Sequence, residues 1–340
     1  MTPGMESVPC DLCRSDDAQV VLRQRDLLLK VTDEEFTIVR CRRCGLTYLN
    51  PRPSQQAIGA YYPTVYYPPV PVKARPHVQQ QAMRFSARIK RWVLEDYYGY
   101  PSPSPGGLNR ALRRLLLWPE KTMRELKGRH PLPWRGEGKL LDVGCGAGGN
   151  LKGLQGQGWT VSGIEISEVA AAHAREVVDG HIHAGTLESA PFDAGTFDLV
   201  LMSHSLEHLP SPVDALQRVN RLLKDDGLLV VTVPNAKSLE AGLFGQWWFH
   251  WDPPRHFYHF DRDTLARAIQ LAGLQPVQFR TGTGSTFFLA SLERWWSAHR
   301  GSDLPLKKLL DRLLIRPLCL AVGHAGYGTE LTVYATKAGK

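Results

Sequence analysis

The 340-residue sequence contains no run of 18 apolar residues, so we expect no membrane-spanning helix. Its first residues lack the charged-then-apolar pattern of a secretory leader, and this absence predicts a cytoplasmic protein. Cysteine is scarce, at six residues, and cysteines in a reducing compartment bind metal or pack more often than they form disulfides. The 43% hydrophobic content excludes wholesale disorder and is typical of a chain with a large core.

Acidic residues are depleted in two parts of the chain. Residues 73–139 hold 15 Lys/Arg against 5 Asp/Glu, and residues 286–340 hold 8 against 4. Residues 1–72 are balanced at 8 and 8, whereas residues 140–285 are acidic at 10 against 16. The formal net charge of +8 therefore comes from two basic flanks. These basic flanks predict attraction of an anionic acceptor or contact with an anionic membrane surface. The alternative is that their charges form an ordinary solvated face.

The basic segment 73–139 is expected to be helical. Apolar residues recur at three- and four-residue spacing over 77–98, which predicts one helix. A second helix is expected to start near residue 108, and Pro119 is expected to interrupt it.

Four of the six cysteines form two CxxC pairs, Cys10/Cys13 and Cys41/Cys44. Each pair can place two thiolates on one tight turn, and two such turns complete a tetrahedral Zn²⁺ site with Zn–S bonds of about 2.3 Å. Four thiolates leave no position for water, so we expect a structural ion; redox-active cysteines are the alternative. The balanced charge of residues 1–72 argues against nucleic-acid binding by this module.

From residue 139 onward, short apolar strands alternate with helices. This alternation predicts a mostly parallel, doubly wound α/β sheet, whose ligands bind at the carboxyl ends of the strands. Strands are expected within 139–143, 159–167, 197–209, 227–235, 274–281 and 330–337, and helices over 168–178, 212–224 and 262–272.

A glycine-rich turn follows the first of these strands. Gly144, Gly146 and Gly148 allow a sharp turn and a close approach of the backbone to a ligand. Glu165 lies about 20 residues later at the end of the second strand, where a carboxylate can accept hydrogen bonds from ribose hydroxyls. This pattern suits any adenosine-containing cofactor. The GxGxG spacing, preceded by Asp142, differs from the GxGxxG of dinucleotide oxidoreductases, which makes that class the less favoured alternative.

The segments 140–149, 163–167, 184–212 and 222–235 together resemble class I S-adenosylmethionine-dependent methyltransferases. The resemblance covers roughly residues 139–280, and residues 330–337 supply the terminal strand, so it implies a seven-stranded Rossmann-like sheet. It also implies a cofactor-binding set, which comprises Asp142, Gly144, Cys145, Gly146, Glu165, Ile166, Thr186, Leu187, Glu188, Ser203 and His208.

The resemblance implies a place for most of these residues. Asp142 and the glycines would surround the methionine half of S-adenosylmethionine, and Glu165 would bind the ribose. The segment 186–188 would lie at the adenine, and Ser203 near the sulfonium. Cys145 is expected to pack within the turn rather than act as a nucleophile, and His208 to position the cofactor or the structure beside it.

The segment 244–265 is dense in aromatic residues and histidines. Its Pro253–Pro254 pair argues for a shaped loop at the strand ends, where function concentrates. Arg255, His256 and His259 can place polar groups in a pocket there; the alternative is that they are satisfied in the core.

The whole arrangement resembles bacterial sugar and natural-product methyltransferases that begin with a four-cysteine zinc ribbon. Residues 41–53 match their ribbon exit, and residues 254–260 (PRHFYHF) lie where the sugar C-methyltransferases carry a Glu-His pair followed by Tyr. This resemblance implies His256 as the general base. Arg255 stands in place of that Glu and His259 in place of that Tyr, which weakens the inference to carbon methylation. We expect Arg255 to bind a phosphate or carboxylate of the acceptor.

Three domains are expected: a zinc ribbon with a Tyr/Pro-rich exit over 1–60, a helical linker or cap over 61–135, and a methyltransferase domain over 136–340. A helical insert at about 286–323 is expected to form a lid, with peripheral membrane contact as the alternative. The leading hypothesis is methyl transfer to a polar small molecule such as a sugar or natural-product intermediate. A lipid-linked acceptor is the first alternative, an RNA methyltransferase the second and a non-enzymatic adenosine-binding scaffold the third.

Overall fold

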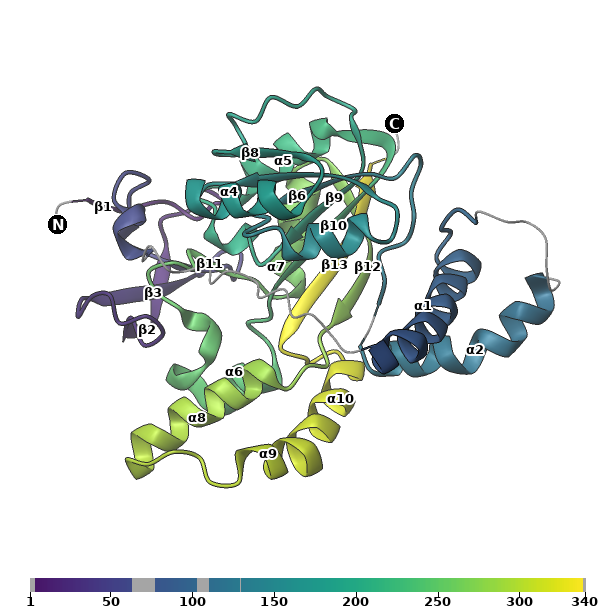
Figure 1. Cartoon of the computed structure of the whole chain (residues 1–340). Helices are drawn as coiled ribbons and strands as arrows, with labels where there is room; N and C mark the ends of the chain where they lie inside the picture. Colours follow the sequence, from purple (N-terminus) through teal and green to yellow (C-terminus); the bar gives the residue numbers. More distant parts are fainter. Residues whose placement is uncertain (1–3, 63–76, 103–109, 129, 339–340) are drawn as a thin grey trace.

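The computed structural model describes residues 4–62, 77–102, 110–128 and 130–338. It contains a small N-terminal sheet, a pair of helices and a large α/β sheet (Figure 1). Parts of the expected helical linker, including the expected start of its second helix, lie outside the described residues. Among the described residues, no helix is both long and apolar enough to cross a membrane.

The N-terminal sheet is antiparallel and is built from β2(Ala18–Arg25), β3(Glu35–Cys41) and β4(Thr47–Leu49). A fourth strand, β11(Tyr258–His259), pairs with β4. It belongs to the segment 244–265, which is dense in aromatic residues and which we call the aromatic loop. The sequence did not predict this pairing. Two further short strands, β1(Met5–Glu6) and β5(Arg52–Pro53), pair with each other beside this sheet.

Two helices, α1(His77–Tyr97) and α2(Arg110–Leu126), form the next part of the chain. They are joined by Arg113, whose guanidinium donates hydrogen bonds of 2.7 Å to each carboxylate oxygen of Asp96. The expected interruption at Pro119 is wrong, because α2 continues through it. Proline cannot donate to the carbonyl of Leu115, but Leu115 is 71% exposed, so water can take the place of the missing N–H.

The large sheet has seven strands in the order β12-β13-β10-β9-β6-β7-β8. Only β13 runs antiparallel to its neighbours β10 and β12. The predicted doubly wound, mostly parallel seven-stranded sheet is therefore confirmed. Its strands are β6(Lys139–Val143), β7(Thr160–Glu165), β8(His181–Ala184), β9(Phe197–Ser203), β10(Leu223–Pro234), β12(Leu274–Thr281) and β13(Glu330–Lys337).

Helices cover both faces of this sheet. Successive side chains of a strand point to opposite faces, so Leu140 packs with Ala171 of one helical layer while Leu141 packs with Leu216 of the other. Burial on both faces explains why these strands are apolar without alternation. The covering helices are α3(Gly149–Gln155), α4(Glu168–Val177), α5(Pro212–Leu222) and α7(Arg262–Leu271).

The strand order reverses at β6, which pairs with β7 on one side and with β9 on the other. In open α/β sheets, ligands bind at the carboxyl ends of the strands beside such a reversal. A short 3-10 turn, η2(Leu206–His208), follows β9 directly and lies at this edge.

The aromatic loop follows β10 and is held by a helical insert between β12 and β13. The backbone N–H of Phe249 donates to Ser291 of α8 at 2.9 Å, and Arg294 of the same helix donates to the carbonyl of Phe249 at 3.0 Å. The loop contains η3(Gly245–Trp247) and η4(Phe249–Trp251), and α6(Leu239–Phe244) leads into it. The insert contains α8(Thr286–Arg300), α9(Lys307–Leu310), the π turn η5(Asp311–Ile315) and α10(Arg316–His324), as Figure 1 shows.

Candidate active site

The glycine-rich turn after β6 brings the backbone close to the end of β9. Gly144, Gly146 and Gly148 all have positive φ, at 81°, 54° and 78°, which side chains other than glycine rarely adopt. A Cβ on Gly144 would lie 2.7 Å from the Cβ of Ser205, so a side chain at that position would collide with the segment after β9. The glycines are thus required by the turn itself.

Glu165 fixes this turn from the end of β7. One carboxylate oxygen accepts a 2.9 Å hydrogen bond from the N–H of Gly146, and the other accepts one of 2.9 Å from Ser167. Each oxygen keeps a second lone pair. The carboxylate is therefore held rigidly and can still accept hydrogen bonds from the hydroxyls of a ribose.

Asp142 lies beside Glu165 and is buried, and its Oδ1 has no hydrogen-bond partner among the described residues. Burial and the charge of Glu165 raise the pKa of Asp142 to about 7. A buried acceptor without a donor is costly, and a cationic ammonium group would satisfy it. The turn therefore fits the amino-acid end of the implied cofactor.

The other residues of the predicted cofactor set occupy the same edge of the sheet. Thr186 lies in a turn directly after β8 that Ser189 closes through a hydrogen bond of 3.1 Å to the Thr186 N–H. Leu187 is buried, Glu188 and Ile166 are exposed, and Ser203 ends β9 half-buried.

Cys145 packs inside the glycine-rich turn. Its Sγ would lie 2.6 Å from a Cβ on Gly163 of β7. Burial, with the nearby Asp142 and Glu165 carboxylates, raises the pKa of its thiol well above the ordinary value, so it stays a neutral packing group.

A second group of polar side chains, Glu207, His208 and His256, meets where η2 contacts the aromatic loop. One potential ligand atom from each lies within 4.8 Å of those of the other two. The loop is held there by backbone hydrogen bonds, since Phe257 N–H donates to the carbonyl of Glu207 at 2.8 Å. We call these three residues the Glu207 cluster. It follows β9, whose end also touches the glycine-rich turn through Ser205.

Hydrogen bonds select the tautomers of both histidines. Nδ1 of His256 lies 2.8 Å from the carbonyl oxygen of His250, and Nδ1 of His208 lies 2.9 Å from that of Arg255. A carbonyl only accepts, so each Nδ1 carries the hydrogen and each Nε2 has a free lone pair. The Tyr62 hydroxyl also lies 3.0 Å from Nδ1 of His208, which brings the exit of the N-terminal sheet to this site.

The charges of the cluster differ sharply from one residue to the next. Burial alone would raise the pKa of Glu207, but His204 and the other histidines hold that pKa at about 2. Burial and the neighbouring His256 lower the pKa of His208 to about 4, and burial also lowers the pKa of His256. Burial opposes charge on His204, yet Glu207 and Glu330 raise its pKa to about 10. At neutral pH the cluster therefore combines one carboxylate with two neutral imidazoles.

Arg255 lies next to the cluster but is completely buried between two carboxylates. Its Nη1 and Nη2 donate to Asp26 at 3.0 and 2.6 Å, and its Nε donates to Asp252 at 3.1 Å. Asp26 follows β2, so this ion triad ties the N-terminal sheet to the aromatic loop. The guanidinium has no exposed surface for an acceptor.

His259 lies in β11 and is also buried. Its ring packs 4.8 Å from that of Trp251, and neither nitrogen has a hydrogen-bond partner among the described residues. Burial and the nearby His256 lower its pKa far below the ordinary value. His259 is therefore a neutral ring behind the cluster, whereas His256 faces Glu207.

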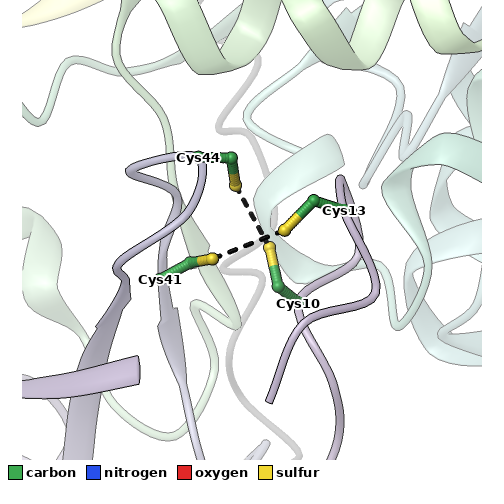
Figure 2. Close-up of side chains that lie close together, drawn as sticks. All are labelled: Cys10, Cys13, Cys41 and Cys44. Atoms are coloured by element: carbon green, nitrogen blue, oxygen red, sulfur yellow. Dashed lines mark hydrogen bonds between the residues drawn. The ribbon is translucent and has the colours of Figure 1, made fainter. Parts of the chain in front are cut away.

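The four N-terminal cysteines converge as their spacing predicts (Figure 2). Their sulfurs lie within 4.8 Å of one another, with 3.4 Å between Cys10 and Cys44 and 3.5 Å between Cys13 and Cys41. None forms a disulfide. Backbone N–H groups of Leu12 and Cys13 point at the sulfur of Cys10, and those of Arg43 and Cys44 at the sulfur of Cys41. Four such thiolates fit a tetrahedral Zn²⁺ ion.

The cysteine module docks directly onto the elements of the site. Asp11, between the first two cysteines, accepts hydrogen bonds of 3.0 Å from Val213 N–H and Ser211 Oγ at the start of α5. Arg52 donates to the carbonyl of Pro210 at 2.7 Å and to the hydroxyl of Tyr258 at 3.0 Å. The module thus supports both η2 and the aromatic loop.

Sequence reasoning missed Asp26 as a partner of Arg255, because that pairing spans 229 positions and leaves no local pattern. It also missed Asp252, although this residue lies only three positions before Arg255. It also left Glu207 and His204 out of the candidate set. The run SHSLEHL at 203–209 did carry a signal, since it places three ionisable residues directly after a strand at the ligand-binding edge.

A family profile described as "Methyltransferase domain" matches residues 106–279, about half of the chain. The ubiquinone biosynthesis O-methyltransferase of Thiobacillus denitrificans is 32% identical over 162 residues, which cover 44% of this chain and 68% of that protein. The enzyme of the same name from Aromatoleum aromaticum is 34% identical over 113 residues, 31% of this chain and 47% of that protein. The chain thus spans between about half and two thirds of the length of these relatives.

A solved S-adenosylmethionine-dependent methyltransferase from Thermotoga maritima has 20% sequence identity and a TM-score of 0.44. The comparison covers 75% of this chain and 97% of that one.

Proposed function

Since the chain belongs to the S-adenosylmethionine-dependent methyltransferases, we propose that it methylates a small polar acceptor bound beside the Glu207 cluster. One observation carries this proposal. The turn held by Glu165 and the Glu207 cluster lie at the carboxyl ends of adjacent strands, β6 and β9, on the two sides of the point where the strand order reverses. A cofactor at the turn would therefore lie next to an acceptor at the cluster.

The cofactor roles follow the residues of the turn. Asp142 would bind the ammonium group, Glu165 the ribose hydroxyls, and residues 186–188 the adenine, with Ile166 beside the ribose and Ser203 near the sulfonium. The glycines admit the cofactor through their missing side chains, and Cys145 packs beneath it. When bound, S-adenosylmethionine supplies an activated methyl group, so this chain has only to orient the acceptor and remove its proton.

His256 is the residue we propose for proton removal. Its Nδ1–H donates to the carbonyl of His250, which leaves a free lone pair on Nε2, and the ring lies beside Glu207 and His208 in the cluster. Acceptance of a proton at Nε2 would place a positive charge beside the Glu207 carboxylate, which stabilises it. The same arrangement would hold for an oxygen or a nitrogen nucleophile.

Arg255 is proposed as a positioning residue in place of the direct acceptor contact expected from the sequence. Both sides of its guanidinium already bind carboxylates, and its carbonyl accepts the hydrogen of His208 Nδ1. His259 is likewise proposed to pack behind His256 and to contact no acceptor. An anionic acceptor would then be attracted by the basic flanks of the chain.

The four cysteines are proposed to hold a structural Zn²⁺ ion, and residues 1–60 to act as a ribbon that supports the acceptor side of the site. Residues 61–135 would then be a helical cap and residues 136–340 the catalytic domain. The contacts of Asp11 with α5 and of β4 with β11 support this role of the ribbon, because both join it to elements of the acceptor side.

The acceptor class rests on the relatives and on the aromatic loop. Sugar and natural-product intermediates remain the leading acceptors, and the O-methyltransferase relatives support a hydroxyl as the nucleophile. A panel of hydroxylated sugars and phenols, assayed by release of S-adenosylhomocysteine, tests this class. We expect His256→Ala to lose turnover while cofactor binding by calorimetry is retained. The half-buried control His173→Ala, on α4, should keep both. Full turnover by His256→Ala would remove His256 from the mechanism.

A lipid-linked acceptor is the second candidate, and exposed apolar residues of the insert favour it. Leu309, Leu313 and Leu314 are exposed on α9 and η5, next to Lys308 and Arg312. Apolar side chains flanked by cations suit an anionic lipid surface.

A further inference from the structure

We propose that the Glu207 cluster is a second metal site, which binds one divalent transition-metal ion through Glu207, His208 and His256. The inference rests on the proposed function, because the ion would lie where the acceptor nucleophile is expected. In this proposal the Nε2 lone pair of His256 binds the metal ion, whereas in the proposed function it accepts the proton of the acceptor. The site is separate from the four-cysteine site, which uses sulfur ligands from the N-terminal module.

The donor atoms are already convergent. One atom from each of the three residues lies within 4.8 Å of the other two, although the residues come from two separate segments of the chain. Both histidines donate Nδ1–H to a backbone carbonyl, at 2.8 and 2.9 Å. This is the outer contact that orients metal-binding histidines and leaves Nε2 as the ligand atom.

The burial of Glu207 is the second, independent observation. Its side chain is 0% exposed, and neither carboxylate oxygen accepts a hydrogen bond within the described part of the chain. One ion-pair contact exists, with His204 Nδ1 3.4 Å from Oε1, but the charge of His204 is shared with Glu330 at 2.7 Å. A buried carboxylate without hydrogen bonds costs several kcal/mol unless a cation satisfies it.

The donor set selects the type of ion. Two imidazoles and one carboxylate suit Zn²⁺, Mn²⁺, Fe²⁺ or Co²⁺, whereas Mg²⁺ and Ca²⁺ prefer oxygen ligands alone. Three protein ligands leave coordination positions open.

An open position predicts an acceptor with a hydroxyl group that can bind the ion. Metal binding lowers the pKa of a bound hydroxyl, so its proton can pass to solvent water. In the transfer the oxygen–carbon bond forms as the carbon–sulfur bond breaks, and the bonding pair stays on sulfur. The proposal thus narrows the acceptor to an alcohol or phenol.

Cobalt titration tests the site with Co²⁺ as the probe and full-length protein whose cysteine site is loaded with Zn²⁺. We expect one equivalent of Co²⁺ to bind, with the weak visible bands of nitrogen and oxygen ligation and without the intense thiolate charge-transfer bands of a cysteine site. The near-isosteric Glu207→Gln and the variant His256→Ala should weaken binding by at least about 10- to 100-fold. The control His173→Ala should bind like the parent protein.

Absence of stoichiometric Co²⁺ binding, or unchanged binding in Glu207→Gln and His256→Ala, would overturn the proposal. Calorimetry with S-adenosylmethionine on the same samples reports folding and separates the two ideas. If the cofactor binds and His256→Ala loses turnover but Co²⁺ does not bind, the metal site is rejected and the base role of His256 stands. If the cofactor does not bind to the parent protein, the proposed function itself fails.

Discussion

Glu165 is the residue on which the cofactor side of the site depends. Its carboxylate accepts hydrogen bonds from Gly146 N–H and Ser167 N–H, and these contacts hold the turn after β6 against the turn after β7. The same oxygens lie at the carboxyl end of β7, at the edge of the sheet where ligands bind in this class of fold. A single side chain thus shapes the turn, and we propose that it also accepts hydrogen bonds from the ribose.

The variant Glu165→Gln tests this role. Its amide keeps the size of the side chain but replaces one acceptor oxygen with a donor, so both a backbone contact and a ribose contact weaken. We expect the dissociation constant for S-adenosylmethionine to rise about 10- to 100-fold, as for the loss of a charge-assisted hydrogen bond. Calorimetry measures it, with the exposed Glu176→Gln of α4 as the control. Equal affinity in both variants would contradict the assignment.

The ionisation of Asp26 makes the free energy of unfolding depend on pH in the acid range. Burial alone would raise its pKa, but hydrogen bonds from Arg255 and from backbone N–H groups hold that pKa at about 2. A carboxyl whose pKa is lowered in the folded state adds stability above its unfolded pKa of about 4, and this stability is lost as the pH falls toward 2.

We therefore expect Asp26→Asn to lose about 2 kcal/mol of stability at pH 6 relative to the parent protein. The difference in the free energy of unfolding should shrink as the pH falls from 4 to about 2. Urea unfolding at a series of pH values measures it. A difference that does not depend on pH would show that Arg255 does not hold the charge of Asp26.

At the scale of elements, the four-stranded sheet joins the cysteine module to the aromatic loop. Strand β11 contributes only two residues, Tyr258 and His259, and begins two positions after His256. Its pairing with β4 and the ion triad of Arg255 fix the loop from one side, while α8 fixes it through Phe249 from the other. The position of His256 therefore depends on the N-terminal sheet.

Loss of a cysteine ligand should uncouple the two halves of the site. In Cys41→Ser the proposed metal site would lose a ligand, so we expect β4 to loosen and β11 to lose its partner. We expect turnover to fall about 100-fold because His256 shifts, while the affinity for S-adenosylmethionine stays within about twofold. The buried Cys319→Ser, which lies outside the metal pairs, is the control. Equal losses of cofactor affinity and turnover would contradict the division between cofactor side and acceptor side.

The elements with a strong local sequence pattern were predicted correctly, whereas contacts between residues far apart in the sequence were missed. The apolar strands, the glycine-rich turn and the two CxxC pairs each depend on neighbouring residues, and the structure contains all of them. The pairing of Arg255 with Asp26 depends on where the N-terminal sheet docks, which no local pattern encodes. The continuation of α2 through Pro119 likewise depends on solvent exposure of one carbonyl.

At the scale of the whole molecule, positive charge lies on the flanks and the site lies in an acidic domain. Much of the flanking charge is already paired, since Arg113 binds Asp96 and Arg124 binds Glu120. Lys308 and Arg312, which lie beside the exposed apolar residues of α9 and η5, form no ion pair within the described part of the chain. Membrane binding through this surface would favour a lipid-linked acceptor over a freely soluble one.

Vesicle flotation tests whether the acceptor is soluble or lipid-linked. The leading proposal predicts that the protein stays in the unbound fraction with both neutral and anionic vesicles. Flotation with anionic vesicles that is lost on Leu313→Glu and Leu314→Glu substitution would instead support the lipid-linked acceptor, because the apolar face and its flanking cations would then carry the contact. The exposed Val277→Glu of β12 is the control.

We propose that the cofactor and the acceptor meet between the turn held by Glu165 and the Glu207 cluster. A crystal structure with S-adenosylhomocysteine measures this most directly. We predict that Glu165 binds the ribose hydroxyls and that the sulfur faces the Glu207 cluster, with room for a nucleophile about 3–3.5 Å from the vacated methyl position. A cofactor whose sulfur points away from Glu207 and His256 would contradict the account.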